Sequence, residues 1–150
     1  MNTLAVILAR AGSAGLANKH LRPLCGRSVI EYTFDHARDA HRVDRIVVST
    51  DCPDVKALAR REQLATIDRP PELATADASV QDAMLHAMKC VEESSQFKAD
   101  ALVVLYGNVP VRSQQVIDRA IELLEQSGCD SVRSFCSVGK WHPAWMSKLE

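Results

Sequence analysis

Two cations flank a loop of small residues near the N-terminus, in an arrangement that suits phosphate chemistry. Arg10 and Lys19 stand on either side of a segment that contains Gly12, Ser13 and Gly15. No acidic residue occurs among the first 30 residues, so this region carries only positive formal charge. Glycines let the backbone approach a ligand closely, and exposed amides with nearby cations bind phosphate groups. The pattern favours a polyphosphate site; the alternative is an ordinary strand–loop joint whose cations are solvated.

Three well-known loop motifs are absent from this segment of the sequence. It contains neither the G-x-x-x-x-G-K-[ST] phosphate loop nor the dinucleotide-binding G-x-G-x-x-G pattern. The esterase pattern G-x-S-x-G fails because Ala11, and not glycine, stands two residues before Ser13. A hydrolase built on Ser13 stays open as an alternative, although no histidine and acid partners are evident.

The composition indicates one soluble globular domain. The chain has 150 residues, is 47% hydrophobic and 25% charged, and carries a formal net charge of −1. This balance gives no overall indication of nucleic acid or an anionic membrane as a partner. No apolar run is long enough to span a membrane, and five cysteines without a C-x-x-C pair are typical of reduced thiols. We therefore expect a cytoplasmic protein that binds neither nucleic acid nor membrane.

Strand and helix patterns alternate along the chain. Short apolar runs predict strands at residues 4–8, 45–49, 64–67, 101–105 and 131–138. Helical spacing of apolar residues predicts helices at about 28–40, 53–61, 79–91 and 113–127, with Ser28, Ser79 and Ser113 as caps. This alternation predicts an α/β fold, a doubly wound and mostly parallel sheet with helices on both faces. The run at 101–105 is apolar throughout, which predicts a central strand.

In an open parallel sheet, ligands bind beyond the carboxyl ends of the strands. The loops after Leu8, Ser49 and Leu105 are therefore the functional candidates. Asp51, in the second of these loops, is either a site residue or only a helix cap, and both interpretations stay open.

The loop after the first strand resembles the opening of the acylneuraminate cytidylyltransferases, the CMP-sialic acid synthetase family. That opening runs roughly A-R-G-G-S-K-G-[IL]-P-x-K-N, and the residues of this chain that match it are Ala9, Arg10, Gly12, Ser13, Gly15, Leu16 and Lys19. The resemblance continues along the chain with V-S-T-D at 48–51, R-P-x-E-L-A at 69–74, H-A at 86–87, D-S-V at 130–132 and H-P at 142–143.

The resemblance implies a fold of the nucleotide-diphosphosugar transferase type and a nucleotidyltransferase activity. CMP would pass from CTP, with Mg²⁺, to a 2-keto sugar acid such as sialic acid, and pyrophosphate would be released. It also implies a homodimer, since H-P introduces the family's dimerisation segment. Family members are longer, so we expect residues 1–150 to be a single nucleotide-binding domain that is truncated before most of that segment and the C-terminal part. The family's metal-binding aspartates lie there, and no metal ligand is assigned among these residues.

The resemblance also assigns roles to individual residues. Arg10 and Lys19 would hold the phosphates as the catalytic cations, while Tyr106 and Asn108 would face the sugar acid. The nucleotide-binding positions implied in the same way are Ala9, Gly12, Ser13, Gly15, Arg69, Asp77 and Ser79. Two of these have a simpler interpretation, because Arg69 could be a surface arginine stacked on Pro70 and Ser79 a helix cap.

Three positions depart from the family pattern. Ala14 replaces a lysine, His20 replaces an asparagine, and Tyr106 replaces the glutamine of the family stretch L-Q-P-T-S-P-L-R. These changes leave two alternatives open: a nucleotidyltransferase of other sugar or base specificity, and a non-catalytic nucleotide- or sugar-binding paralogue. Together with the expected truncation, they predict weak or no turnover by these 150 residues.

Overall fold

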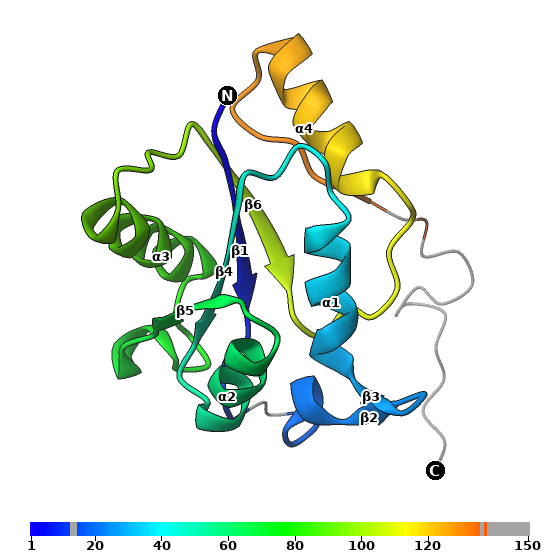
Figure 1. The fold of residues 1–150 in the computed structure, drawn as a ribbon, viewed down its shortest axis with the longest axis vertical. Coiled ribbons are helices and arrows are strands. Elements are labelled where there is room, and N and C mark those ends of the chain that lie inside the picture. The colour runs from blue at the N-terminus through cyan, green and yellow to red at the C-terminus, as the bar shows by residue number, and fades with distance from the viewer. Residues whose placement is uncertain (13–14, 136, 138–150) are drawn as a thin grey trace. The chain divides into compact units, whose positions relative to one another are not determined.

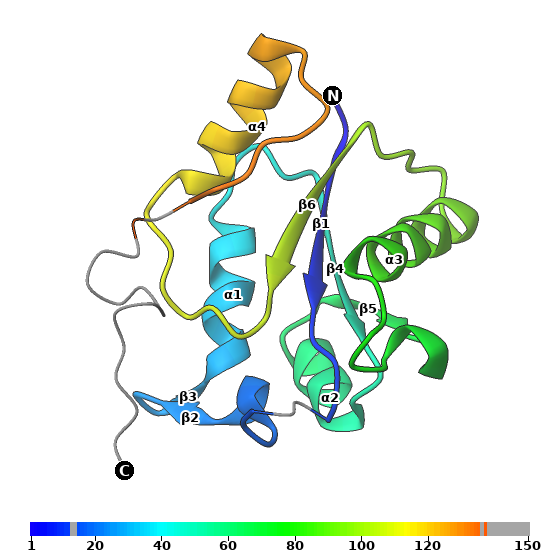
Figure 2. The ribbon, with the colours of Figure 1, turned by 180° about the vertical axis from the view of Figure 1, so that it is seen from behind.

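The chain forms a parallel sheet, so the carboxyl ends of its strands all lie on the same side. The computed structural model describes residues 1–12, 15–135 and 137. Two compact units, Met1–Asp118 and Arg119–Glu150, are described separately. The first unit holds a four-stranded sheet in the order β5-β4-β1-β6, and neighbouring strands are parallel. Their bounds are Thr3–Leu8 for β1, Arg45–Thr50 for β4, Ala65–Asp68 for β5 and Ala101–Tyr106 for β6. The arrows of β1, β4 and β6 point to the same edge (Figures 1 and 2).

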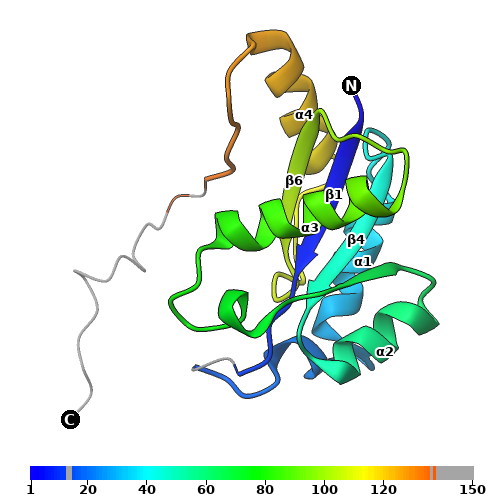
Figure 3. The same cartoon turned by 90° about the vertical axis from the view of Figure 1, so that its left-hand side faces the viewer.

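Helices cover both faces of this sheet. Helix α3 (Val80–Ser94) crosses one face, and α1 (Val29–Arg38) and α2 (Pro53–Arg61) lie on the other (Figure 3). Alternate residues of β1 point toward α3, where Leu4, Val6 and Leu8 form one core cluster with its buried side chains. The predicted doubly wound α/β fold is confirmed.

Two strand predictions are wrong. Strand β6 lies at the edge of the described sheet, beside β1, and is not central. Its apolar composition has another cause: Leu102 and Val104 pack into the α3-side core, and α1 contacts the strand as well. The strand predicted at 131–138 does not occur in residues 131–135 and 137, which pair with no other strand; residues 136 and 138 lie outside the described residues.

Two of the three predicted serine caps occur as expected. The backbone N–H of Ser28 donates to Glu31 Oε2 at 2.6 Å in a capping box, and Ser79 Oγ accepts from the N–H of Gln81 at 3.1 Å. Ser113 is not a cap, because α4 begins at Val116 and runs to Ser127, across the boundary between the two units.

Short elements connect the first strand to α1. The 3₁₀ turn η1 (Lys19–Leu21) follows the first loop, and the hairpin of β2 (Pro23–Leu24) and β3 (Arg27–Ser28) leads into α1. Cys25 and Gly26 both have positive φ, as a two-residue type I′ turn requires. A second 3₁₀ turn, η2 (Pro71–Leu73), follows β5.

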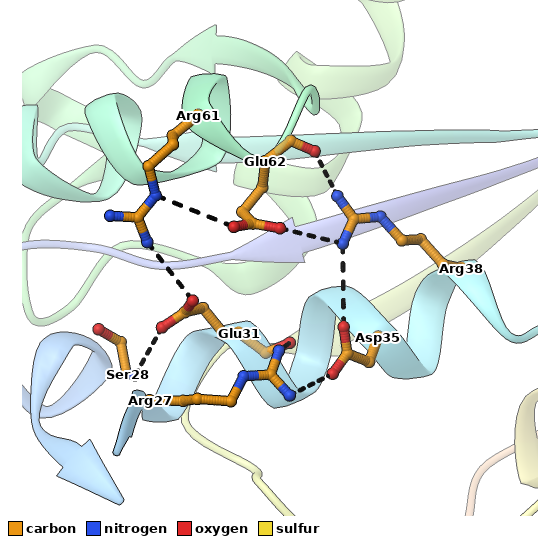
Figure 4. A network of polar contacts seen from close by, with 7 residues as sticks. All are labelled: Arg27, Ser28, Glu31, Asp35, Arg38, Arg61 and Glu62. Carbon is orange, nitrogen blue, oxygen red and sulfur yellow. Dashed lines mark hydrogen bonds and ion pairs between the residues drawn. The ribbon is translucent and has the colours of Figure 1, made fainter.

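A network of ion pairs ties α1 to the C-terminal end of α2 (Figure 4). Arg61 Nη2 lies 3.5 Å from Glu31 Oε1, and Arg38 Nη1 lies 3.4 Å from Glu62 Oε2. Each pair includes an exposed arginine side chain, 36% exposed for Arg38 and 67% for Arg61, so each contributes little stability, about 0–1 kcal/mol. Their effect here is geometric, because they fix the spacing of two helices that pack on the same face. None of the helices in the described ranges is long and apolar enough to cross a membrane.

Replacing Phe34 by Ala should strongly destabilise the first unit. Phe34 on α1 is fully buried, and removing its ring leaves a cavity that typically costs about 3–5 kcal/mol. Phe135 is 89% exposed, so Phe135→Ala should change stability by less than about 0.5 kcal/mol. Urea unfolding of both variants measures the difference, and equal losses would show that α1 does not pack on the sheet as described.

Candidate nucleotide-binding site

The loops after β1 and β6 meet at the point where the strand order of the sheet reverses. The N–H of Gly107 donates to the carbonyl of Leu8 at 3.0 Å, which brings the β6 loop against the end of β1. A Cβ at position 107 would lie 3.1 Å from the Ile30 side chain and 3.3 Å from the Leu8 carbonyl. This close crossing therefore favours glycine, and it forms one wall of the crevice in which doubly wound sheets bind ligands.

Asp51 anchors the loop that follows β1. Its Oδ1 accepts the backbone N–H of Ala11 at 2.8 Å, and the N–H of Ala9 donates to the carbonyl of Ser49 at 3.1 Å. The N-cap position of α2 is Cys52, so the interpretation of Asp51 as a helix cap is wrong. Gly12 then adopts a φ of +66°, the left-handed conformation that glycine accepts most readily. Position 51 therefore sets the path of the cationic loop.

An open cavity of about 260 Å³ lies beside these loops. Arg10, Lys19 and Arg69 contribute three cationic side chains to its wall, and no carboxylate of the described residues lines it. The neutral polar side chains of the wall are His20, Thr75, Ser79, Tyr106 and Asn108. A cavity with several cations and no acid in its wall attracts an anionic ligand. The apolar part of the wall comes from Leu8, Leu73, Val80 and the alanines 76, 78 and 83.

Arg69 is buried in the floor of this site. Its Nη2 donates to the carbonyl of Ser49 at 2.7 Å and its Nε to Ser49 Oγ at 3.1 Å. Burial lowers the pKa of its guanidinium; the charge of Asp51 opposes this shift and the charge of Arg10 adds to it. The interpretation as a surface arginine stacked on Pro70 is wrong, because the side chain is only 7% exposed.

The structure gathers some of the predicted site residues and separates others. Six of them line the 260 Å³ cavity: Arg10, Lys19, Arg69, Ser79, Tyr106 and Asn108. Gly12 lines a neighbouring hollow of about 10 Å³, whereas Gly15 and Asp77 line neither space. Ala9 is fully buried beneath the loop, and Ser13 lies outside the described residues.

Comparison with known proteins identifies the family to which this chain belongs. The sequence profile of the family described as Cytidylyltransferase matches residues 4–142. This chain belongs to the cytidylyltransferase family. An N-acylneuraminate cytidylyltransferase of Streptococcus agalactiae is 30% identical over 99% of this chain and 35% of its own length. A 3-deoxy-manno-octulosonate cytidylyltransferase of Brucella ovis is 31% identical over 87% of this chain and 49% of its own length. The chain thus spans about a third to a half of these relatives, and its resemblance to the acylneuraminate enzymes is confirmed.

Solved structures of similar proteins agree on the fold. A CMP:2-keto-3-deoxy-manno-octonic acid synthetase complexed with CTP superposes with a TM-score of 0.72 at 23% identity, over 85% of this chain and 49% of that one. A Mycobacterium tuberculosis protein in complex with manganese gives a TM-score of 0.58 at 20% identity, over 82% of this chain and 59% of that one. At these identities the likeness shows the α/β nucleotidyltransferase fold.

Metal ligands of this family member are not found within the described ranges. No group of three or more His, Cys, Asp or Glu side chains lies close enough there to hold a metal ion. Asp51, the acid nearest the cationic loop, already uses Oδ1 for the Ala11 amide. The described residues therefore do not by themselves fit a protein-bound metal, and the charged groups that they place in the cavity wall are cations.

Arg112 holds the β6 loop in place. Its Nη2 donates to the carbonyl of Tyr106 at 2.9 Å, and its Nη1 to the carbonyl of Val109 at 2.8 Å and to Thr33 Oγ1 at 3.1 Å. Because Thr33 is fully buried on α1, the arginine links the loop to the helix layer. No role was predicted for Arg112 from the sequence, although it is the last residue of the family stretch that contains Tyr106.

His20 is a second residue whose place the sequence did not predict. It is only 6% exposed, lines both the cavity and the small hollow, and its Nε2 has no hydrogen-bond partner among the described residues. Burial, followed by the charges of Lys19 and Arg69, lowers the pKa of its imidazole from 6.5 to about 4. The one feature of the sequence that pointed to His20 is that it replaces the asparagine of the family pattern.

Replacing Asp51 by Ala should release the loop after β1. The Ala11 N–H would lose its acceptor, and an unpaired buried donor costs about 1–3 kcal/mol. Amide hydrogen exchange followed by NMR should show Ala11 protected in the wild type and fast-exchanging in the variant. Asp54→Ala, at an exposed position in the first turn of α2, is the matched control and should leave Ala11 protected. Continued protection of Ala11 in Asp51→Ala would contradict the anchor.

His20 should also make folding stability depend on pH. The unfolded chain binds a proton on this imidazole below about pH 6.5, whereas the folded chain does so only near pH 4. Stability is therefore full above pH 6.5 and falls as the pH is lowered toward 4, by on the order of 3 kcal/mol. His20→Asn lacks the titrating group. Urea unfolding of both proteins should show that the free energy of unfolding of the wild type falls relative to that of the variant as the pH is lowered from 6.5 to 4. A difference that stays constant over this range contradicts the prediction.

Proposed function

We propose that this chain is the nucleotide-binding part of an enzyme that transfers CMP from CTP to a 2-keto sugar acid. The anomeric hydroxyl of the acid attacks the α-phosphorus of CTP and releases its proton to solvent, the bond between the α-phosphorus and its bridging oxygen breaks, and pyrophosphate leaves. The observation that carries the proposal is the acid-free wall of the large cavity, which holds Arg10, Lys19 and Arg69 at the switch point of the sheet.

We assign different residues of the cavity wall to the phosphates of CTP, to its base and to the sugar acid. Arg10 and Lys19, on the loop beyond β1, would hold the phosphates as fixed charges. Two of the three guanidinium nitrogens of Arg69 bind Ser49, and we assign the third, Nη1, to the base side of the nucleotide together with Ser79. Tyr106 and Asn108 are exposed at the end of β6 and would face the sugar acid.

Catalysis by these residues would rest on position and charge. The cations neutralise charge that develops on the leaving pyrophosphate, and they do so without reorganising, because the loop is anchored at Ala11. Mg²⁺ bound with CTP would supply further charge neutralisation. In the same proposal the protein is cytoplasmic and acts as a homodimer, as the resemblance to the acylneuraminate enzymes implies.

The relatives leave the sugar acid to be determined. Those named above act, by their names, on N-acylneuraminate or on 3-deoxy-manno-octulosonate. Pyrophosphate release from CTP in the presence of Mg²⁺ and each of these acids distinguishes the two acceptors. Release that depends on one acid identifies it, whereas release that occurs without any acid, and that neither acid increases, contradicts a transferase.

Calorimetric titration with CTP, UTP, ATP and GTP, each with Mg²⁺, tests the nucleotide. We expect CTP to bind most tightly and Arg10→Ala to weaken it by about 1.5–3 kcal/mol, the usual loss for a charge-assisted contact. Arg60, an exposed arginine on α2, is the control, and Arg60→Ala should leave affinity nearly unchanged.

Each other outcome of this titration has a definite meaning. Binding of no triphosphate removes the proposed function. Tighter binding of ATP or UTP redirects it to another nucleotide, and equal losses in Arg10→Ala and Arg60→Ala would show that the phosphates lie elsewhere.

A further inference from the structure

His20 is buried in the wall of the cationic cavity and has an unsatisfied ring nitrogen. Its side chain is 6% exposed and lines both the 260 Å³ cavity and the 10 Å³ hollow beside it. Nε2 is buried and has no hydrogen-bond partner within the part of the chain that the structure describes. A buried polar atom without a partner costs free energy, so such an atom in a binding cavity is typically one that a ligand satisfies.

The charged groups that surround His20 are cations. Lys19 precedes it on the same turn, Arg69 faces it from the segment after β5, and Arg10 shares both cavity walls with it. From α2 it meets Cys52 and Val55 across the small hollow. Helix α1 also packs against η1.

The one buried acid of α1 is already engaged. Glu31 accepts the N–H of Ser28 and pairs with Arg61. In the empty cavity the imidazole is therefore neutral, because a proton on it would add a further positive charge to the cluster.

We propose that His20 is a ligand-contacting residue that takes up one proton from solvent as a nucleoside triphosphate enters the cavity, after which its Nε2–H donates to an oxygen of the bound anion. The identity of the ligand rests on the proposed function. The proton step belongs to this chain, because the asparagine that the family pattern has at this position cannot titrate.

Two effects of the anion favour the protonated imidazole. The phosphates place negative charge among Lys19, Arg69 and Arg10, so the repulsion that opposes a proton on His20 is offset. The anion also supplies an acceptor for a charge-assisted hydrogen bond, which is stronger than a bond to a neutral donor. Protonation of His20 thus adds a cation to a sequence in which Ala14 replaces a lysine of the family pattern. The competing arrangement is an ordered water in the small hollow that satisfies Nε2, since that space holds about one water.

Calorimetry in buffers of different ionisation enthalpy decides between these arrangements. CTP with Mg²⁺ is titrated at pH 6.0 into wild type, His20→Asn and the control His86→Asn, and the slope against buffer enthalpy gives the protons bound. His86 on α3 also has a buried unpartnered nitrogen, its Nδ1, but it does not line the cavity. We expect wild type and His86→Asn to take up at least about half a proton more per CTP than His20→Asn. Comparing variants cancels the protons that CTP itself exchanges.

A measurement on the wild type alone covers the case in which His20→Asn does not fold. The imidazole of His20 is titrated by NMR with and without CTP, and its pKa should rise from about 4 to above 6 when CTP is bound. Equal proton uptake in wild type and His20→Asn, or an imidazole pKa that CTP does not move, overturns the inference while leaving the proposed function intact. Failure of CTP and every other triphosphate to bind overturns both.

Discussion

The buried contact between Arg69 and Ser49 is the interaction on which the cationic cavity depends. The carbonyl of Ser49 accepts both the Arg69 guanidinium and the backbone N–H of Ala9, so one residue of β4 fixes the loop after β1 and the segment after β5. Ser49 is fully buried, and both its hydroxyl oxygen and its carbonyl oxygen accept hydrogen bonds. A shift of the Ser49 backbone would therefore move two walls of the site together.

The cationic side chains of the cavity wall repel one another, so other groups must offset this repulsion. Asp51 provides part of the compensation from outside the cavity wall, because it binds the Ala11 amide and its charge favours the charged form of Arg69. Neutral His20 provides another part by remaining uncharged beside Lys19. Fixed cations of this kind lose little free energy to reorganisation when an anion arrives, which is the condition for electrostatic catalysis of phosphoryl transfer. The same repulsion explains why the protonation state of His20 is tied to the ligand.

The sequence was most informative where local chemistry alone decides the structure. Apolar runs located β1, β4 and β6, and Ser28 and Ser79 marked the starts of α1 and α3, because strand burial and helix capping depend on neighbouring residues. The order of strands depends on long-range pairing, so the edge position of β6 was not predicted.

The same distinction holds for the candidate site. Glycines and cations indicated the loop, and the structure brings Arg10, Lys19 and Arg69 to one cavity. The burial of Arg69, the anchoring by Asp51 and the unsatisfied nitrogen of His20 arise from residues that are distant in sequence. A spacing pattern carries no information on such contacts.

The β6 loop shows how a site can change its ligand while its fold is kept. The path of this loop is set by Gly107 against the end of β1 and by Arg112 bound to two loop carbonyls, and neither contact involves the side chain at position 106. The glutamine of the family pattern can therefore be replaced by Tyr106 without a change in backbone hydrogen bonding. Tyr106 is 48% exposed on the cavity wall, so the replacement changes the surface of the cavity and not the core. In the proposed function, specificity for the acceptor would thus be separable from the cations that would hold the phosphates, and the two could vary independently within one fold.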